Sequence, residues 1–180
     1  MAYINTIDPD HAEGIVKQEY EKGIHRAGRV YNILKIMSQS PAALKDAMRM
    51  YLTIMHGASE LSRAQREMIA TVVSQVNHCK YWIEAHGEDF RDEVGDQDLA
   101  EQLKKDWRAA QLSDIDKVLC SWVEKLTLTP SNMNKKDVEK LEGVGFSQSA
   151  ISDAAQVAGY FNYINRIADG LGVDLEDEME

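Results

Sequence analysis

A glutamate, a cysteine and a histidine stand at spacings that could support proton or thiol chemistry in the stretch Ser62–Phe90. Cys79 follows Glu67 by 12 residues, and His86 follows Glu67 by 19. A thiolate is the nucleophile of cysteine chemistry, histidine exchanges protons near neutral pH, and a carboxylate can orient or polarise such a relay. These residue types predict a catalytic site. The structural alternative is a buried cysteine and a hydrogen-bonded histidine in a helical core.

The glutamate and the histidine can cooperate only if the chain turns between them. In one straight helix, 19 residues would separate Glu67 from His86 by about 28 Å. Asn77-His78 is the expected place for a break, because Asn is a strong helix N-cap. The two helices would then fold back on each other and bring Glu67 to the second one. The other possibility is that the carboxylate comes from another subunit.

The second of these helices would carry the cysteine, a tryptophan and the histidine on one face. Cys79, Trp82 and His86 stand at i, i+3 and i+7, which is one side of a helix. Cys79 would lie in the first turn, where the helix N-terminus stabilises a thiolate.

The remaining sequence predicts an all-α protein. No run with strand periodicity and turn chemistry occurs, and helical apolar spacing recurs along the whole chain. We expect a single helical domain over residues 1–180, with an N-terminal helical part at 1–58 and a core at 59–180. Helix starts are indicated by a capping residue followed by a proline or by a capping-box partner. The expected starts are Asp8-Pro9 for a helix reaching Tyr20, Ser40-Pro41, Ser62 with Gln65, and Ser147.

Composition restricts the possible partners and compartment. The chain has 20 Lys and Arg against 30 Asp and Glu, a net charge of −10, which argues against nonspecific binding to nucleic acid or to anionic membranes. No segment has the length of apolar sequence that a membrane span needs, and no signal peptide is recognisable. Two cysteines do not make a disulfide framework, so we expect a cytoplasmic protein. The acidic tail 174–180 is expected to be solvated.

Two stretches resemble a known family. LSRAQREMIATVVSQVNHCKYW and GFSQSAISDAAQVAGYFNYINRIADGLGV are similar to the peroxidase-related branch of the alkylhydroperoxidase D-like (AhpD-like) group, within the carboxymuconolactone decarboxylase superfamily. Its signature is E-x11-C-x-x-C-x-x-x-H, and Glu67, Cys79 and His86 match it. The resemblance implies an all-helical fold and a homo-oligomer, often a trimer or hexamer. It also implies a thiol peroxidase or disulfide reductase reaction, in which the second cysteine attacks peroxide, the first resolves the disulfide, and Glu and His relay protons.

The sequence departs from this pattern at the attacking position. Trp82 stands where the second cysteine belongs, and Tyr81 replaces an additional family histidine. Cys79 therefore matches only the resolving cysteine, and no C-x-x-C disulfide can form. We expect weak or absent peroxidase activity, catalytic positions at Glu67, Cys79 and His86, and substrate contacts from Tyr81 and Trp82.

Three functions remain open. The first is an antioxidant one-cysteine oxidoreductase, in which Cys79 is oxidised and then reduced by a small-molecule thiol or dithiol. The second is a decarboxylase-like, non-redox enzyme that does acid–base chemistry on a small carboxylic acid or lactone. The third is a non-catalytic oligomeric binding protein.

Other polar and aromatic residues bear on these functions. No cofactor is expected, and no metal either, because adjacent His78 and Cys79 would point to different sides of a helix. Cys120 is expected in the core, and the aromatic residues of the last helix are expected to serve packing. Candidate anchors for a substrate carboxylate are Arg63, Arg66, Lys80 and Arg166.

Overall fold

The computed structural model describes residues 2–179, which contain helices and no strand. This confirms the all-α class. The α-helices are α1 (Gly14–Ala27), α2 (Asn32–Ile36), α3 (Pro41–His56), α4 (Arg63–Asn77), α5 (Lys80–Val94), α6 (Gln97–Lys105), α7 (Asp114–Leu128), α8 (Lys135–Gly143) and α9 (Gln148–Leu171), and short 3-10 turns lie at Pro9–His11, Pro130–Asn132 and Asp177–Met179.

The chain forms two compact units, and each is described by itself. The site unit is Thr53–Asn165, and the terminal unit comprises the residues up to Leu52 and those from Arg166 onward. The boundaries fall within α3 and α9. Glu67, Cys79 and His86 all belong to the site unit. The expected single domain over 1–180, with its division at residue 58, stays a prediction.

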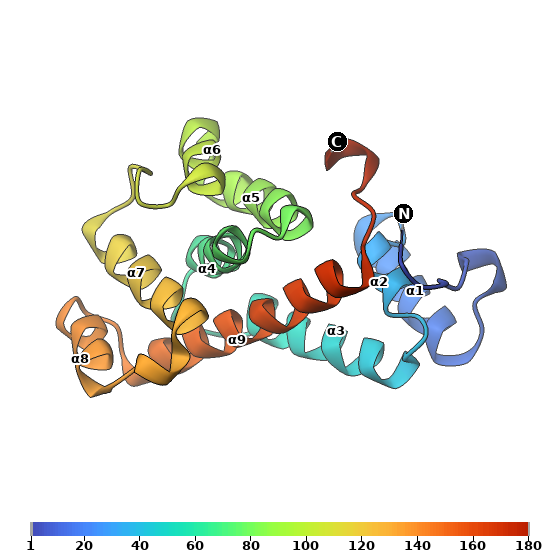
Figure 1. The fold of residues 1–180 in the computed structure, drawn as a ribbon, viewed down its shortest axis with the longest axis horizontal. Helices are drawn as coiled ribbons and strands as arrows, with labels where there is room; N and C mark the ends of the chain where they lie inside the picture. Colours follow the sequence, from blue (N-terminus) through green and yellow to red (C-terminus); the bar gives the residue numbers. More distant parts are fainter. Residues whose placement is uncertain (1, 180) are drawn as a thin grey trace. The chain divides into compact units, whose positions relative to one another are not determined.

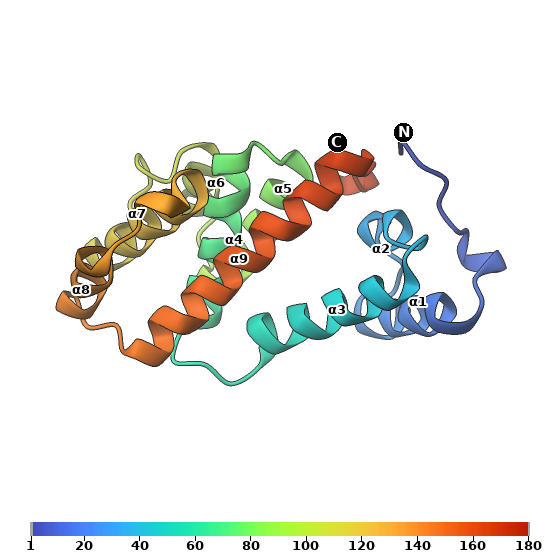
Figure 2. The same cartoon turned by 60° about the horizontal axis from the view of Figure 1, so that its bottom comes forward.

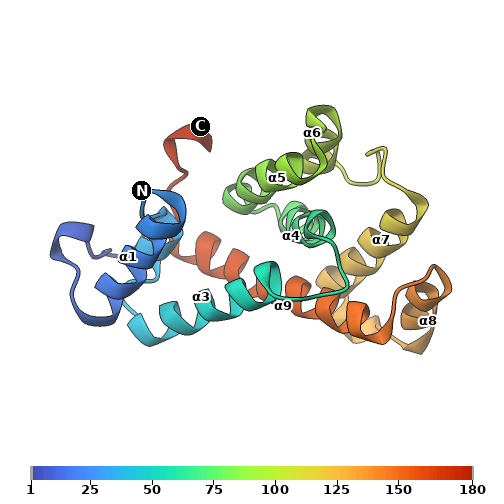
Figure 3. The same ribbon diagram turned by 180° about the vertical axis from the view of Figure 1, so that it is seen from behind.

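Helix α4 is the central element of the site unit. It packs against α5, α6 and α7, and Figures 1 and 3 show it enclosed by these helices and by the first part of α9. Every residue from Arg66 to Ser74 is buried. A helix with neighbours on all sides must hide any polar side chain it carries in hydrogen bonds. Glu67, on this buried run, is such a side chain.

The start of α4 follows from local sequence. The Ser62 hydroxyl accepts a hydrogen bond from the Gln65 backbone N–H, and the Gln65 side chain accepts one from the Ser62 N–H. This reciprocal pair satisfies two backbone donors that the first helical turn would otherwise leave open. The predicted capping box is confirmed.

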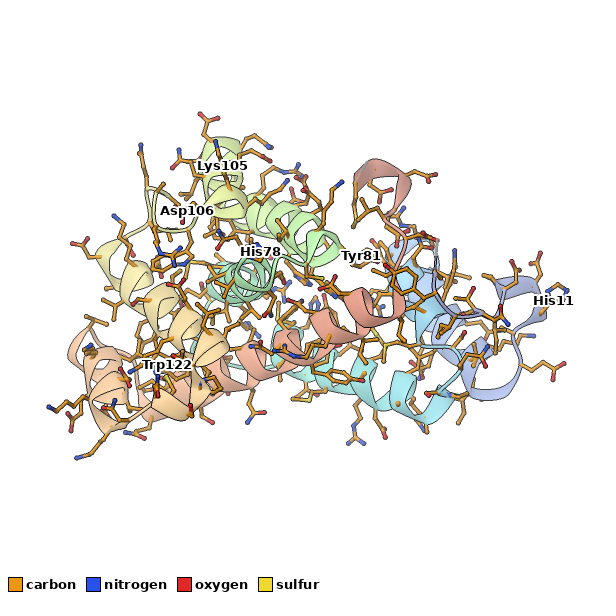
Figure 4. All side chains as sticks on the ribbon, in the orientation of Figure 1. His11, His78, Tyr81, Lys105, Asp106 and Trp122 are labelled. Atoms are coloured by element: carbon orange, nitrogen blue, oxygen red, sulfur yellow. The ribbon has the colours of Figure 1, made fainter. Side chains whose placement is uncertain are left out.

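The break between α4 and α5 is confirmed, but its geometry differs from the prediction. His78 takes a left-handed conformation with φ 60°, and Cys79 is the N-cap of α5. Asn77, predicted as the cap, is instead the last residue of α4 and donates from its amide to Asn162 and Asn165. Figure 4 marks His78 and Tyr81 on either side of this turn. Cys79 therefore precedes the first turn of α5, two positions earlier than an N-cap at Asn77 would place it.

The terminal unit corrects two further predictions. Pro9 begins only a 3-10 turn, and α1 starts separately at Gly14. The acidic tail is not simply solvated: Glu176 is buried and accepts a hydrogen bond from the Asn32 backbone N–H at 2.6 Å. That bond satisfies a donor at the start of α2, and Arg29 also pairs with Glu178.

The start of the last helix agrees with the predicted cap, and α8 follows α7 along the chain. The Ser147 hydroxyl accepts from the Ala150 N–H at 3.1 Å, as predicted for the cap of α9. Figure 2 shows α8 beside α7, and the two helices are in contact. Within the described residues, no helix is long and apolar enough to cross a membrane.

Candidate functional site

A buried carboxylate–imidazole pair joins α4 to α5. His86 Nδ1 lies 2.5 Å from Glu67 Oε2, and both side chains are at most 2 % exposed. The turn at His78 brings them together, so one chain supplies both groups and no second subunit is needed. When Nδ1 donates its proton to Glu67, the lone pair of a neutral imidazole is on Nε2. The pair can therefore act as a general base whose ring is oriented by the carboxylate.

Charged groups connect this pair to the protein surface. Arg63 Nη2 lies 2.5 Å from Glu67 Oε1, and Arg63 Nε lies 3.5 Å from Glu93 Oε1. Asp89 Oδ2 is 3.6 Å from His86 Nδ1, and its side chain is about half exposed. Partial burial raises the pKa of Asp89, while the nearby His86 and Arg63 act in the opposite direction. Asp89 thus offers a carboxyl group between the buried imidazole and solvent.

Aromatic rings cover the imidazole on its other sides. The Trp82 ring is stacked on His86, with centroids 5.3 Å apart and planes at 22°, and Phe161 meets His86 edge-on at 4.6 Å. Tyr81, also buried, packs edge-on against Trp82 at 5.1 Å. Both sequence-predicted substrate residues therefore belong to the aromatic wall. The indole N–H of Trp82 is buried and has no hydrogen-bond partner in the described part of the chain.

Cys79 lies in a separate polar network. It is fully buried, and its sulfur is 4.0 Å from the Asn165 carbonyl oxygen on α9. The Asn165 amide also donates to the Ser74 hydroxyl at 3.1 Å and accepts from Asn77 at 3.1 Å. A thiol in such surroundings is enclosed by protein rather than presented to solvent.

The second cysteine does not complete a thiol pair. Cys120 lies on α7, is buried as predicted, and has a pKa raised by that burial. Its thiol remains protonated at neutral pH, which removes the nucleophilic form.

Both carboxylate oxygens of Glu67, a possible metal ligand, are already held by protein contacts. Ligand atoms of Glu67, His86 and Asp89 lie within 4.8 Å of one another, a set that could hold a divalent cation. However, Arg63 occupies one oxygen of Glu67 and His86 Nδ1 the other. The two oxygens of Glu67 are thus occupied by an arginine and a ring nitrogen rather than open to a cation. The set considered from the sequence does not form, because His78 is an exposed residue at the turn.

Three site residues were not identified from the sequence. Arg63 was considered only as a substrate anchor, whereas it pairs with Glu67. Asp89 stands one helical turn after His86, and this i, i+3 spacing was the available signal. Phe161 was assigned to packing, and only the tertiary fold shows that it touches the imidazole. Arg66, another proposed anchor, donates instead to the backbone carbonyls of Ile54 and Gly57.

Solved structures place this fold in a known class. An uncharacterized peroxidase-related protein from Silicibacter sp. TM1040 is 32% identical, with a TM-score of 0.87, covering 97% of this chain and 93% of that one. The AhpD core of a peroxidase-related protein from Ralstonia eutropha JMP134 has a TM-score of 0.92 at 22% identity, covering 99% and 94% of the two chains. The debrominase Bmp8, in its apo form, shares the fold at a TM-score of 0.80 and 11% identity, over 98% and 93% of the two chains. The chain is an AhpD-like, peroxidase-related protein.

A family model gives a narrower assignment within that class. The model described as PA26 p53-induced protein (sestrin) matches residues 3–178. The chain belongs to this family. A search of curated proteins found no match.

Proposed function

We propose that this protein keeps the proton relay of the AhpD-like fold, lacks its two-thiol peroxidase reaction, and uses the relay for acid–base chemistry on a small carboxylic acid or lactone. The observation that carries the proposal is the Glu67–His86 pair at 2.5 Å with the Trp82 ring stacked on the imidazole. By resemblance, position 82 is where the attacking thiol belongs. An indole there cannot form a bond with peroxide oxygen and then a disulfide.

The two-thiol reaction needs a second reactive thiol, which this chain does not place beside Cys79. Reduction of a hydroperoxide by two thiols yields a disulfide, an alcohol and water, so each turnover needs two neighbouring sulfurs. Cys79 is the only sulfur nucleophile in the signature. Cys120 lies on α7, with its pKa raised by burial. Cys79 therefore has neither a second reactive thiol nor a C-x-x-C partner with which to form a disulfide.

The relay supports proton transfer instead. Glu67 orients the imidazole through Nδ1, and in the proposed reaction a substrate that displaces part of the aromatic cover gives a proton to Nε2 and receives it back. Trp82 and Phe161 exclude water around the ring, which strengthens electrostatic interactions inside the site. Arg63 and Asp89 provide the polar side through which protons exchange with solvent. Tyr81 and Trp82 would contact the substrate.

A one-cysteine redox reaction is the second candidate, and the position of Cys79 favours it. Cys79 is the N-cap residue of α5, close to the positive end of the helix dipole, which favours a thiolate, although its side chain makes no capping hydrogen bond to the first turn. In that reaction the thiol becomes a sulfenic acid, and a small-molecule thiol or dithiol reduces it back. Complete burial of Cys79 argues against fast oxidation.

Restoring the thiol tests the lost reaction. We expect no dithiol-dependent peroxide turnover by the natural protein above that of Cys79→Ser. Trp82→Cys should form a disulfide with Cys79 on peroxide treatment, seen as the loss of two hydrogens in intact mass. Trp82→Cys combined with Cys79→Ser is the matched control and should not. Rapid peroxide turnover by the natural protein that depends on Cys79 would instead establish the one-cysteine reaction.

A substrate screen tests the acid–base reaction. Small lactones and carboxylic acids should include a compound that the protein turns over, and His86→Asn and Glu67→Gln should each reduce that turnover by about 10²–10⁴-fold, the range of a general base. Asp92→Asn, at an exposed position on the same helix, is the control. Turnover that survives His86→Asn would overturn the relay, and a screen with no substrate would favour a non-catalytic binding protein.

Assembly and location belong to the same proposal. The resemblance supports a homo-oligomer, a trimer or hexamer, and the net charge of −10 and only two cysteines, too few for a disulfide framework, suit a cytoplasmic protein. Sedimentation of the purified chain would give its mass in solution. A monomer at micromolar concentration would contradict the expected assembly.

A further inference from the structure

A cleft with basic walls lies between α7 and α8, and it shares no residue with the Glu67–His86 relay. Its volume is about 340 Å³, and α7 contributes most of its lining. This is the lower end of the volume range for small-molecule sites. Figure 4 places Trp122 where α7 meets α8. The lining residues are Lys117, Val118, Ser121, Trp122, Lys125, Asp137 and Lys140.

The charge of the cleft is opposite to that of the whole chain. Three lysines and one aspartate line it, although the chain carries −10. Lys125 Nζ lies 2.6 Å from Asp137 Oδ2, and the same oxygen accepts from the Asn134 backbone N–H at 2.9 Å. The hydrogen bond from Lys125 lowers the pKa of Asp137, so this carboxylate is ionised and committed to its partners.

Two lysines are left to bind a ligand. Lys117 and Lys140 are exposed, and neither has an ion pair among residues 2–179. They come from α7 and α8, so their ammonium groups approach the cleft from two helices. Lys140 also feels the charge of Asp137, but Lys125 holds that carboxylate directly, so the net positive charge around the hollow favours an anionic group.

Trp122 supplies an independent sign of a ligand. Its side chain is only 8% exposed, and its indole Nε1–H is buried without a hydrogen-bond partner in the described chain. An indole N–H is a donor only, and buried donors are normally paired. Of the buried indoles with this deficit, Trp122 is the one that lines the cleft. An acceptor oxygen of a bound molecule would satisfy it.

We infer that this cleft binds a small organic anion, a carboxylate or a phosphate monoester on an apolar body. Lys117 and Lys140 hold the anionic group, the Trp122 N–H donates to one of its oxygens, and the apolar body packs on the Trp122 ring and Val118. Ser121, also on the lining, adds a hydroxyl donor. The requirement for both charge and an apolar body separates this site from a general cationic surface.

The test uses benzoate and phenyl phosphate as probes, with inorganic phosphate to measure binding of the charge alone. The indole N–H resonances are followed by nitrogen–proton NMR, and Trp122→Phe assigns the Trp122 signal among the three tryptophans. We expect one organic probe to shift the Trp122 resonance with saturation, while Trp82 and Trp107 stay in place. The organic probe that binds identifies the anionic group, and inorganic phosphate should bind more weakly than phenyl phosphate.

Matched variants decide whether the cleft itself binds. Lys117→Gln combined with Lys140→Gln should weaken binding at least tenfold, and Trp122→Phe should weaken it less. The control is Lys105→Gln combined with Lys136→Gln, which removes the same charge from exposed positions outside the cleft and should leave the affinity unchanged. Circular dichroism checks that all variants fold. No saturable shift at millimolar probe, or equal loss in both double variants, would overturn the proposal, as would a change of oligomeric mass in the cleft variant alone.

Discussion

Replacement of Glu67 by alanine should be among the most damaging single changes in the site unit. Glu67 is fully buried and holds Arg63 on one oxygen and His86 on the other. Removing it leaves a buried imidazole N–H without an acceptor and an arginine without its nearest carboxylate. Breaking a buried, hydrogen-bonded ion pair by deleting one partner costs about 3–5 kcal/mol.

That cost converts to a large thermal shift. For chains of 150–250 residues, 1 kcal/mol corresponds to about 2–4 °C in Tm, so Glu67→Ala should lower Tm by about 6–20 °C. Glu67→Gln keeps an acceptor for His86 Nδ1–H and leaves the Arg63 charge partly in water, so its cost should be smaller, about 1–3 kcal/mol. Urea unfolding followed by circular dichroism measures the free energies, and calorimetry measures Tm.

The matched control is Glu139→Ala, at an exposed i, i+4 pair in which Lys135 Nζ lies 3.2 Å from Glu139 Oε1. Pairs of this kind contribute about 0.3–0.5 kcal/mol, so the control should barely change the free energy of unfolding. If Glu67→Ala costs no more than the control, Glu67 does not hold the relay together, and the argument from burial and pairing fails.

Other changes test the local physics of the fold. Gly57→Ala would place a Cβ 2.3 Å from the Thr53 carbonyl oxygen and should lower the free energy of unfolding by about 1–3 kcal/mol. Gly143→Ala meets nothing within 4 Å and should be neutral or stabilising by up to about 1 kcal/mol in the same urea titrations. Ser62→Ala removes the capping hydroxyl of α4 and should cost about 1 kcal/mol in urea unfolding. Asp137 has a lowered pKa, so its stabilisation is present above the unfolded-state pKa of an aspartate and lost as pH falls through the folded-state pKa. Asp137→Asn should flatten the acid limb of the stability–pH curve, and an unchanged limb would refute the assignment.

The local features of this site could be predicted from the sequence. A serine cap, its Gln65 partner and an asparagine–histidine pair predicted a helix, its start and its interruption, because capping depends on residues a few positions apart. The interruption then allowed Glu67 and His86 to approach each other within one chain, the first of the two arrangements that the sequence left open. The error at Asn77 was also local: a left-handed His78 ends α4, and Asn77 uses its amide for tertiary bonds to α9.

Contacts between distant segments could not be read in the same way. Phe161 and His86 are 75 positions apart, and no periodicity indicates that their rings meet. The tail was expected to be solvated because it is acidic, yet Glu176 finds the open N–H of Asn32 on another segment. Composition predicts the average surroundings of a residue, whereas one specific partner can override that average.

Trp82 decides between the chemistries that the fold could support. A thiol at its position would be a small nucleophile beside the imidazole, whereas the indole covers the ring and keeps water away from it. In such a site an isolated charge is costly, but a proton taken up at His86 Nε2 makes an imidazolium whose charge is balanced by the Glu67 carboxylate already in contact with Nδ1. The Glu67–His86 contact does not depend on a thiol at position 82, whereas Cys79, buried in the amide network of Asn165, has no second cysteine at the C-x-x-C position. Under the proposed function, a tryptophan at position 82 excludes the two-thiol reaction of the family and leaves the carboxylate–imidazole pair for proton transfer.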